Sequence, residues 1–313
     1  MTSEEAREGR VVFITATSGT SDDNETPLLM KLLKEKHGVD AVNLAWDTPD
    51  VFEHWTQRDV GIVKSPWNYH LKYDEFVAFL DEVERRNLVI HNSLSVLRSN
   101  IHKGYLTKLE EKGIPTIPTA HYSRGTKHSV ADLVEQRGWS DVVIKPAVGA
   151  SSFKTKHFRA ADHEAAQAHL DALLADRDAM VQKFMHSIRT RGETSLIWFD
   201  GALSHAVHKR ATFEGDQLHF PEHSAAPTEV ERAFVDRVLA TQPPCLYARI
   251  DIMQDDDGSI RLSELELTEP YLYLPIHPGA SEAYAAAIAR TLQRHTAATA
   301  TTTSTAQAVD SKQ

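Results

Sequence analysis

Two segments near the carboxyl end of the chain read as the arms of one β-hairpin, and this hairpin constrains the fold more than any other feature. Residues 246–252 form the first arm and residues 261–267 the second. They are joined by Asp255-Asp256-Asp257-Gly258, a sequence that strongly favours reversal of the chain. Side chains two residues apart lie on the same face of a strand. The hairpin therefore presents alternate side chains of each arm on one face.

Charge is concentrated on that face. Arg249 shares a strand face with Asp251, and Glu264 shares a strand face with Glu266. If the two faces coincide, the three carboxylates repel one another by several kcal/mol in partly buried surroundings. A divalent cation or an unusual protonation state is then needed to hold them, and Mg²⁺, which prefers hard oxygen ligands, fits best. The alternative is an acidic hairpin whose side chains are simply solvated.

An element farther upstream has the features of an anion-binding loop. Residues 142–146 form a short apolar strand that carries Lys145, and the loop after it contains Gly149, Ser151 and Ser152. Small residues permit close approach to the backbone, and successive amides with two hydroxyl groups could cradle phosphate oxygens. The loop has neither the Gly-x-x-x-x-Gly-Lys-Ser/Thr spacing of a P-loop nor the Gly-x-Gly-x-x-Gly spacing of a dinucleotide-binding fold. An ordinary turn is the alternative.

Taken in order along the chain, these elements resemble the ATP-grasp ligases over residues 95–290. The resemblance implies an α/β (α+β ATP-grasp) fold, in which a small N-terminal parallel α/β domain precedes two subdomains that clamp ATP. It also implies a strand that hydrogen bonds adenine through its backbone, two phosphate-binding lysines and a mobile loop over the phosphates. The implied ATP-binding residues are Lys103, Lys145, Gly149, Ser151, Ser152, Gln182, Lys183, Phe184 and Glu193.

The same resemblance assigns roles to the charged hairpin. Asp251, Glu264 and Glu266 match the metal ligands of the family. Arg249 and Lys209 match catalytic residues that hold the substrate carboxylate and stabilise charge on the acyl phosphate. The last ligand position is often asparagine in this family, whereas this chain has Glu266, so the metal site carries one more negative charge. One or two Mg²⁺ ions are therefore implied, with Mn²⁺ as a substitute.

An enzyme of this family would phosphorylate the carboxylate of a small amino-acid-like molecule with ATP, and an amine would then displace phosphate to form an amide. Residues 61–119, combined with Glu264-Leu265-Glu266 and Glu269-Pro270, most resemble the glutathione-synthetase-like branch. Within it, they most resemble the cyclo-ligase that closes O-ureidoserine to cycloserine. The alternatives are an intermolecular amino-acid ligase of natural-product biosynthesis, a phosphotransferase of the same fold, and an ATP-binding protein without ligase chemistry.

Ahead of the ATP-grasp region, strands alternate with amphipathic helices, which predicts a small parallel sheet with flanking helices. The expected strands are 10–15, 39–45 and 60–64, and the expected helices are 27–37 and 73–86. The predicted divisions are an N-terminal domain 1–95, a small subdomain 96–185, a C-terminal subdomain 186–295 and a disordered tail 296–313, which is rich in threonine and alanine.

Three residues that follow the third strand are candidates for contact with the acceptor substrate. Trp67, Asn68 and Tyr69 lie where a parallel sheet binds ligands, at the carboxyl end of a strand. The alternative is that Trp67 and Tyr69 seal a boundary between domains.

Charge and cysteine content narrow the partners and the compartment. The 34 basic and 44 acidic side chains leave a formal net charge of −10 without a concentrated basic tract, so nucleic acid is not an expected partner. The one cysteine, Cys245, permits no intrachain disulfide and is expected to be structural. The sequence lacks an apolar run of about 18 residues, so no membrane contact is expected. We expect a cytoplasmic enzyme with a small-molecule substrate, acting as a monomer or a homo-oligomer.

Overall fold

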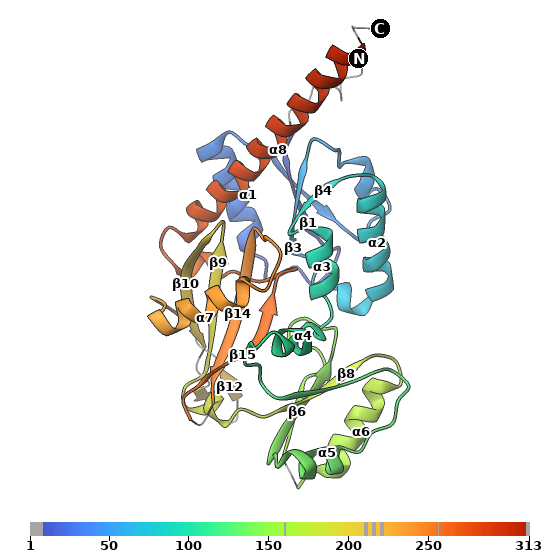
Figure 1. The fold of residues 1–313 in the computed structure, drawn as a ribbon, viewed down its shortest axis with the longest axis vertical. Coiled ribbons are helices and arrows are strands. Elements are labelled where there is room, and N and C mark those ends of the chain that lie inside the picture. Colours follow the sequence, from blue (N-terminus) through green and yellow to red (C-terminus); the bar gives the residue numbers. More distant parts are fainter. Residues whose placement is uncertain are drawn as a thin grey trace.

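In the computed structural model, three main sheets follow one another along the long axis of the molecule (Figure 1). The structure describes residues 9–159, 161–209, 212–214, 217–219, 222–255 and 257–310, without the side chains of 212–214, 217–219 and 301–310. Helices cover the sheets on several sides, so the predicted α/β fold class is confirmed.

The N-terminal sheet is parallel, with the strand order β2-β1-β3-β4. Its elements are β1 (Val11–Thr15), α1 (Glu25–His37), β2 (Ala41–Ala45), η1 (Val51–Glu53), β3 (Val60–Ser65), η2 (Tyr69–Leu71), α2 (Tyr73–Arg85) and β4 (Val89–His91). Val11 and Phe13 of β1 pack with α1, whereas Val12 and Ile14 pack with α2. Because helices cover both faces, β1 is apolar along nearly its whole length.

The second sheet is antiparallel, with the order β5-β8-β6-β7. Its elements are β5 (Thr119–Tyr122), α5 (Val130–Arg137), β6 (Asp141–Pro146), β7 (Lys156–Arg159), α6 (His163–Leu174) and β8 (Ala179–Lys183). Val142 and Ile144 pack beneath α5 and α6. Lys145, the next residue on β6, points to the opposite face, which is where the cavity described below lies.

The third sheet is also antiparallel, with the order β13-β10-β9-β14-β15. The remaining elements are α3 (Leu94–Asn100), α4 (Tyr105–Glu111), η3 (His186–Arg189), β9 (Glu193–Phe199), β10 (Ala202–Lys209), β11 (Thr212–Glu214), β12 (Gln217–His219), β13 (Glu222–Ala225), α7 (Glu229–Leu239), β14 (Tyr247–Gln254), β15 (Ile260–Glu266), η4 (Leu274–Ile276) and α8 (Ala280–Asp310). The β9–β10 hairpin turns at Asp200 and Gly201, which both have a positive φ, as a tight hairpin requires.

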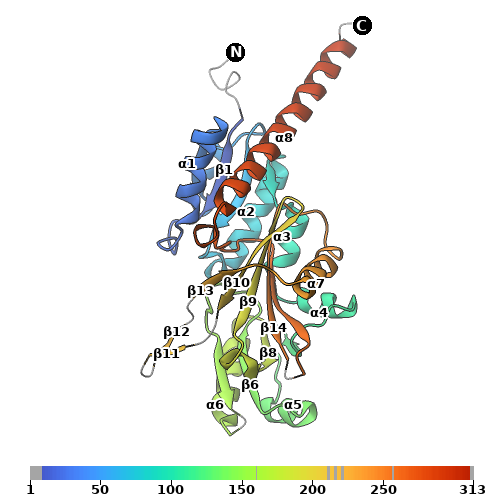
Figure 2. The ribbon, with the colours of Figure 1, turned by 90° about the vertical axis from the view of Figure 1, so that its left-hand side faces the viewer.

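Helix α8 returns from the third sheet to the N-terminal sheet and lies against α1 (Figure 2). Part of the predicted C-terminal subdomain thus packs on the predicted N-terminal domain, while the domain boundaries themselves stay predictions. The expectation of a disordered tail from residue 296 is wrong as far as Asp310, because α8 continues to that residue. Alanine has the highest helix propensity, and a helix propagates readily from a packed first half. Residues 311–313 lie outside the described part.

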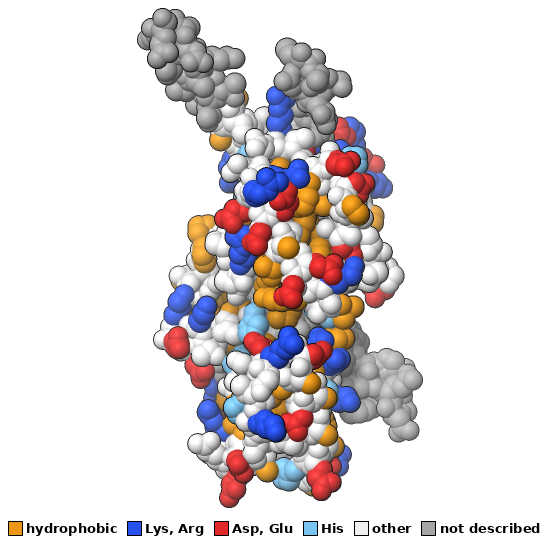
Figure 3. All heavy atoms as spheres, turned by 90° about the vertical axis from the view of Figure 1, so that its right-hand side faces the viewer, with side chains coloured by type: hydrophobic (Ala, Val, Ile, Leu, Met, Phe, Trp, Pro, Cys, Tyr) orange, Lys and Arg blue, Asp and Glu red, His pale blue; other side chains and the backbone are white. Residues whose placement is uncertain are grey.

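Acidic and basic side chains are interspersed over the described atoms of the face shown in Figure 3, without a continuous basic area. Within the described part of the chain, none of the helices has the length and apolar character needed to span a bilayer.

Candidate active site

The predicted acidic hairpin is present as β14 and β15, and its register unites the two charged faces. Asp251 lies opposite Glu264, and Arg249 lies opposite Glu266. The side chain of Asp251 is buried, and those of Glu264 and Glu266 are 20% and 24% exposed. The alternative of a solvated acidic hairpin is therefore wrong. Asp256, in the connecting turn, lies outside the described residues.

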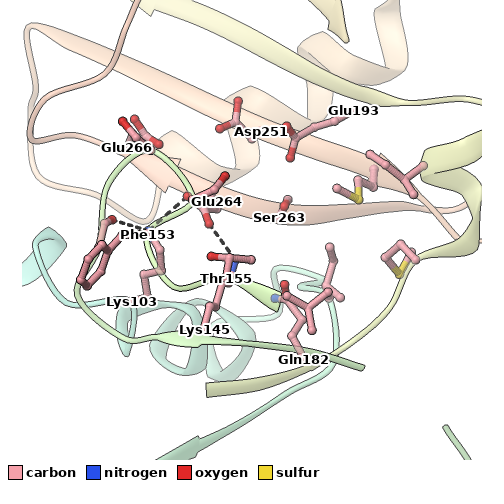
Figure 4. Close-up of a pocket in the computed structure, with 18 of the residues that line it drawn as sticks. Lys103, Lys145, Phe153, Thr155, Gln182, Glu193, Asp251, Ser263, Glu264 and Glu266 are labelled. Atoms are coloured by element: carbon pink, nitrogen blue, oxygen red, sulfur yellow. Dashed lines mark hydrogen bonds and ion pairs between the residues drawn. The ribbon is translucent and has the colours of Figure 1, made fainter. Parts of the chain in front are cut away.

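Each of these three carboxylates contacts a basic side chain. Nη2 of Arg249 lies 3.0 Å from Oδ2 of Asp251 and also contacts Glu266. Glu264 accepts hydrogen bonds from Nζ of Lys145 at 2.8 Å and from Nζ of Lys103 at 3.1 Å, as Figure 4 shows. Lys145 is on β6 and Lys103 precedes α4, so Glu264 connects the third sheet to the opposite side of the cleft.

Burial and neighbouring charges together set the protonation of this cluster. Burial opposes ionisation of Glu264, but Lys103 and Lys145 outweigh it and lower the pKa of that carboxyl. Burial raises the pKa of Glu266; Arg249 opposes the rise, while Asp251 and Glu264 add to it. Burial also opposes the charge on Lys103, yet Glu264 raises the pKa of this lysine. Of the two glutamates, Glu266 is therefore the one whose pKa is raised by the neighbouring negative charges.

The chemistry of these donors fits Mg²⁺, although their arrangement is that of an ion-pair network. Asp251, Glu264 and Glu266 offer the hard oxygen atoms that Mg²⁺ prefers. Within the described ranges, however, no three acidic, histidine or cysteine side chains are grouped so that they could hold an ion. Glu264 is turned toward two lysines instead. The repulsion that raises the pKa of Glu266 is what an added cation would relieve.

A second ion pair lies beside this network. Glu193 on β9 and Lys209 on β10 are cross-strand partners, and the Nζ atom of Lys209 is 2.7 Å from Oε2 of Glu193. Burial opposes the charge on Lys209, but Asp251 and Glu193 raise its pKa. The structure therefore brings Lys209 and Arg249 to the same acidic cluster, as the sequence predicted.

A cavity of about 440 Å³ separates the second and third sheets and contains this cluster. Its apolar lining includes Ile117, Val143, Phe184, Met185, Ile188 and Met253. Its charged lining consists of Lys103, Lys145, Lys183, Lys209, Arg249, Glu193, Asp251, Glu264 and Glu266. Gly149, Ser151, Ser152 and Gln182 complete the set of predicted ATP-binding residues that line it. The lining thus combines a set of apolar side chains with a dense set of charged ones.

The strand expected to hydrogen bond adenine lines this cavity, but two of its amides are already used. The amide of Lys183 donates to the carbonyl of Pro118 at 2.9 Å, and the amide of Phe184 donates to that of Asp141 at 3.0 Å. The side-chain amide of Gln182 donates to a threonine hydroxyl of β5. Because these two amides are used within the sheet, adenine would have to bind other backbone groups of this segment, such as carbonyl oxygens, and its binding here stays a prediction.

The loop after β6 forms part of the lining of the cavity. Ser151 and Ser152 have φ angles of 48° and 56°, values that non-glycine residues seldom adopt. At the tip of the loop, the ring of Phe153 lies 4.5 Å from the ring of His70 and 5.2 Å from the guanidinium carbon of Arg177. The loop is therefore held against both the N-terminal sheet and the small subdomain.

A second cavity of about 430 Å³ adjoins the first. The two share Lys103, Gly149, Ala150, Ser151, Arg249 and Glu266. Trp67 and Tyr69 line the second cavity, and their contact with a substrate stays a prediction. Asn68 lines neither described cavity: it is buried and binds Trp46 Nε1 and Asp47, each at 2.8 Å. Asn68 lies in the turn that leads into η2, between Trp67 and Tyr69, and its side chain points inward. Its assignment to the substrate is therefore wrong.

Several residues of this second cavity had not been predicted. They are Gly19, Asp22, Asn100, Ile101, Tyr105, Glu222, Leu265, Glu269 and Tyr271. Burial raises the pKa of Glu269 to about 7, and the charge of Glu266 adds to the rise. The spacing of Glu269, three residues after Glu266, was an available signal. The others come from separate segments and share no local pattern.

Comparisons with known proteins identify chains that are similar to this one along most of its length. Residues 11–92 match a family model described as the N-terminal domain of D-cycloserine synthetase DcsG. The cycloserine biosynthesis protein DcsG of Streptomyces lavendulae is 28% identical over 301 residues, which cover 91% of this chain and 99% of that protein.

Solved structures give the same result. A crystal structure of D-cycloserine synthetase DcsG has a TM-score of 0.82 at 27% identity and covers 91% of this chain and 100% of its own. The D-alanine–D-alanine ligase of Bacillus anthracis, complexed with ATP, has a TM-score of 0.67 at 16% identity, covering 92% and 98%, and shares the fold. The chain is an ATP-grasp ligase.

Proposed function

We propose that this ligase uses ATP and Mg²⁺ to convert the carboxylate of a small amino acid into an acyl phosphate, and that a nitrogen of the same molecule then closes a ring. The observation that carries the proposal is the pair of adjoining cavities, which meet at Lys103, Arg249 and Glu266. A nucleotide in the first cavity and an amino acid in the second would bring a terminal phosphate and a carboxylate together at this seam.

The first cavity suits a nucleotide in shape and charge. Its volume of about 440 Å³ lies in the range of small-molecule sites. Apolar side chains of the lining would accept a base, and the lysines would accept phosphates. Asp251, Glu264 and Glu266 would hold Mg²⁺, which would neutralise charge on the phosphate oxygens. Phosphates would compete with Glu264 for Lys103 and Lys145, and so would free this carboxylate.

The reaction would proceed in two displacements. An oxygen of the substrate carboxylate attacks the terminal phosphorus of ATP, and the bond to the bridging oxygen breaks, so that ADP leaves with that electron pair. A substrate nitrogen then attacks the carbonyl carbon and loses a proton, and the carbon–oxygen bond to phosphate breaks. Arg249 and Lys209 would stabilise the charge that develops on the transferred group. The loop held by Phe153 would keep water from the acyl phosphate.

Ring closure within one molecule is favoured by the similarity to D-cycloserine synthetase, whose name describes such a product, and O-ureidoserine is the first substrate to test. The second cavity, with a volume of about 430 Å³, is large enough for one or two small amino acids. The D-alanine–D-alanine ligase with the same fold favours intermolecular ligation as the second candidate. A phosphotransferase that stops at the first displacement is the third.

One experiment separates these candidates. The protein is incubated with ATP, Mg²⁺ and amino acids, singly and in pairs, with O-ureidoserine among them; released phosphate and product mass are measured. Ring closure releases one phosphate for each amino acid consumed, and it does so when a single amino acid is present. A product with two amino-acid units indicates intermolecular ligation, and a phosphorylated product without free phosphate indicates a phosphotransferase. Lys209→Met should abolish turnover, whereas Lys34→Met, a change at an exposed lysine that lines neither cavity, should not.

A further inference from the structure

We propose that Glu269 binds the α-ammonium group of the substrate, so that the second cavity selects zwitterionic amino acids over carboxylic acids without an amine. The inference rests on the proposed function, because it takes the second cavity as the amino-acid site. The proposed function assigns the reacting carboxylate, and this inference adds how the protein recognises the α-ammonium group, which does not react.

The charged side chains that line the second cavity fall into two groups. The lining contains two basic side chains, Lys103 and Arg249, and both also line the first cavity. Asp22, Glu222 and Glu269 line only the second cavity. At the seam, Glu266 is paired with Arg249. A zwitterion with its carboxylate at Lys103 and Arg249 would direct its ammonium group toward the acids that line only the second cavity, where complementary charge favours it.

Glu269 is the most sheltered of these three acids. Asp22 and Glu222 are exposed, whereas Glu269 is partly buried. Its carboxylate is hydrogen bonded to the Tyr69 hydroxyl, and its backbone carbonyl accepts a hydrogen bond from Trp67 Nε1 at 3.2 Å. Glu264 and Glu266 have basic partners, but among the described residues no basic side chain forms an ion pair with Glu269. Lys103 and Arg249 act on Glu269 through space, but both are paired with other acids. A ligand ammonium group would give this sheltered carboxylate an ion-pair partner of its own.

The surroundings of Glu269 suit a cation and are rigid. Aromatic rings attract cations through their faces, and the rings that line this cavity belong to Trp67, Tyr69, Tyr105 and Tyr271. The segment that carries Glu269 is fixed by Glu25, which accepts hydrogen bonds from the amides of Leu272 and Leu274 at 3.1 and 2.8 Å. A charged group held this firmly can discriminate between ligands, because it does not move aside when the ammonium group is missing.

An anchored α-ammonium group also determines which nitrogen reacts. Attack of the α-nitrogen on the carbonyl carbon of its own molecule would close a three-membered ring. With that nitrogen bound to Glu269, the side-chain nitrogen remains to close the larger ring, while the carboxylate stays at the seam beside Lys103 and Arg249.

The test compares O-ureidoserine with its des-amino analogue, 3-(ureidooxy)propanoic acid, in phosphate-release assays. For Glu269→Gln we expect kcat/KM to fall about thirtyfold or more for O-ureidoserine and less than threefold for the analogue, with an unchanged KM for ATP. Equal losses for both compounds would overturn the proposal. Glu35→Gln, a change at an exposed acid of α1 that lines neither cavity, is the control and should change the preference less than threefold.

Two further measurements keep the outcome decisive. Tyr69→Phe removes the hydroxyl that binds Glu269 and keeps the ring, so the preference should fall about threefold even if Glu269→Gln does not fold. If the wild-type protein releases no phosphate with any amino acid, the proposed function fails. Calorimetric titration with O-ureidoserine and with the analogue then tests Glu269 separately, and equal affinities of the wild type for both would refute its role.

Discussion

Replacing Glu25 by glutamine should destabilise the protein by about 3–5 kcal/mol, because it breaks an ion pair that is closed to water. Glu25 contacts Lys64, and the two side chains are 0% and 2% exposed. Glu25 also accepts hydrogen bonds from the backbone amides of Leu272 and Leu274. Glutamine retains one acceptor oxygen for these amides but leaves the ammonium group of Lys64 buried without a counter-charge.

The magnitude follows from burial, and the chain offers a matched control. Lys34 and Asp40 form an ion pair of 2.7 Å between α1 and the turn before β2, but their side chains are 63% and 71% exposed. Solvent screens such a pair, so Asp40→Asn should cost at most about 1 kcal/mol. Urea-induced unfolding of the wild type and the two variants, with equal dependence on urea, gives the free energies of unfolding.

A loss of less than about 1 kcal/mol for Glu25→Gln, similar to that for Asp40→Asn, would refute this reasoning. A second readout concerns the site. Because the segment held by Glu25 carries Glu269 and Tyr271, Glu25→Gln should also weaken substrate binding in the second cavity. The exposed control should leave binding unchanged.

Three further predictions concern the site itself. Lys145→Ala should weaken ATP binding about tenfold or more in calorimetric titration, since a charged hydrogen bond is lost; an unchanged Kd would exclude this lysine from the nucleotide site. Phe153→Ala removes the ring contact with His70, so two- to tenfold more phosphate should be released without amide product, whereas an unchanged ratio of phosphate to product would exclude a covering role. The pKa of Glu269 is about 7, above its ordinary 4.5, so the folded state binds this proton more tightly than the unfolded state. Stability should then fall by up to about 3 kcal/mol from pH 4.5 to 7, and Glu269→Gln should lack this fall in urea unfolding; identical pH profiles would contradict it.

Local patterns in the sequence were sufficient for several elements. The alternation of strands and helices before residue 95 predicted the parallel sheet, because apolar periodicity reports directly which face of an element is buried. The spacing of Arg249, Asp251, Glu264 and Glu266, together with the acidic turn, predicted the hairpin and its charged face. The resemblance to ATP-grasp ligases then predicted that Lys145 and Lys209 lie near this charged face.

Other features depended on contacts between distant residues, which no local pattern contains. Asn68 and Trp67 are neighbours in sequence, yet one side chain is buried in the N-terminal domain and the other lines a cavity, because the turn that leads into η2 directs them differently. Glu269 follows the acidic hairpin closely in sequence, but only the approach of Trp67 and Tyr69 makes it a sheltered acid.

The sequence by itself determined the types of element, the hairpin and the set of charged residues, because these follow from side-chain periodicity and turn chemistry within short segments. The tertiary structure alone decided how the charges are paired. Lys145 reaches Glu264 across 119 residues of chain, and Glu25 fixes the amide of Leu272 across 247. Such pairs form only when packed sheets bring distant segments within hydrogen-bond range, so the partner of each buried charge is a property of the fold.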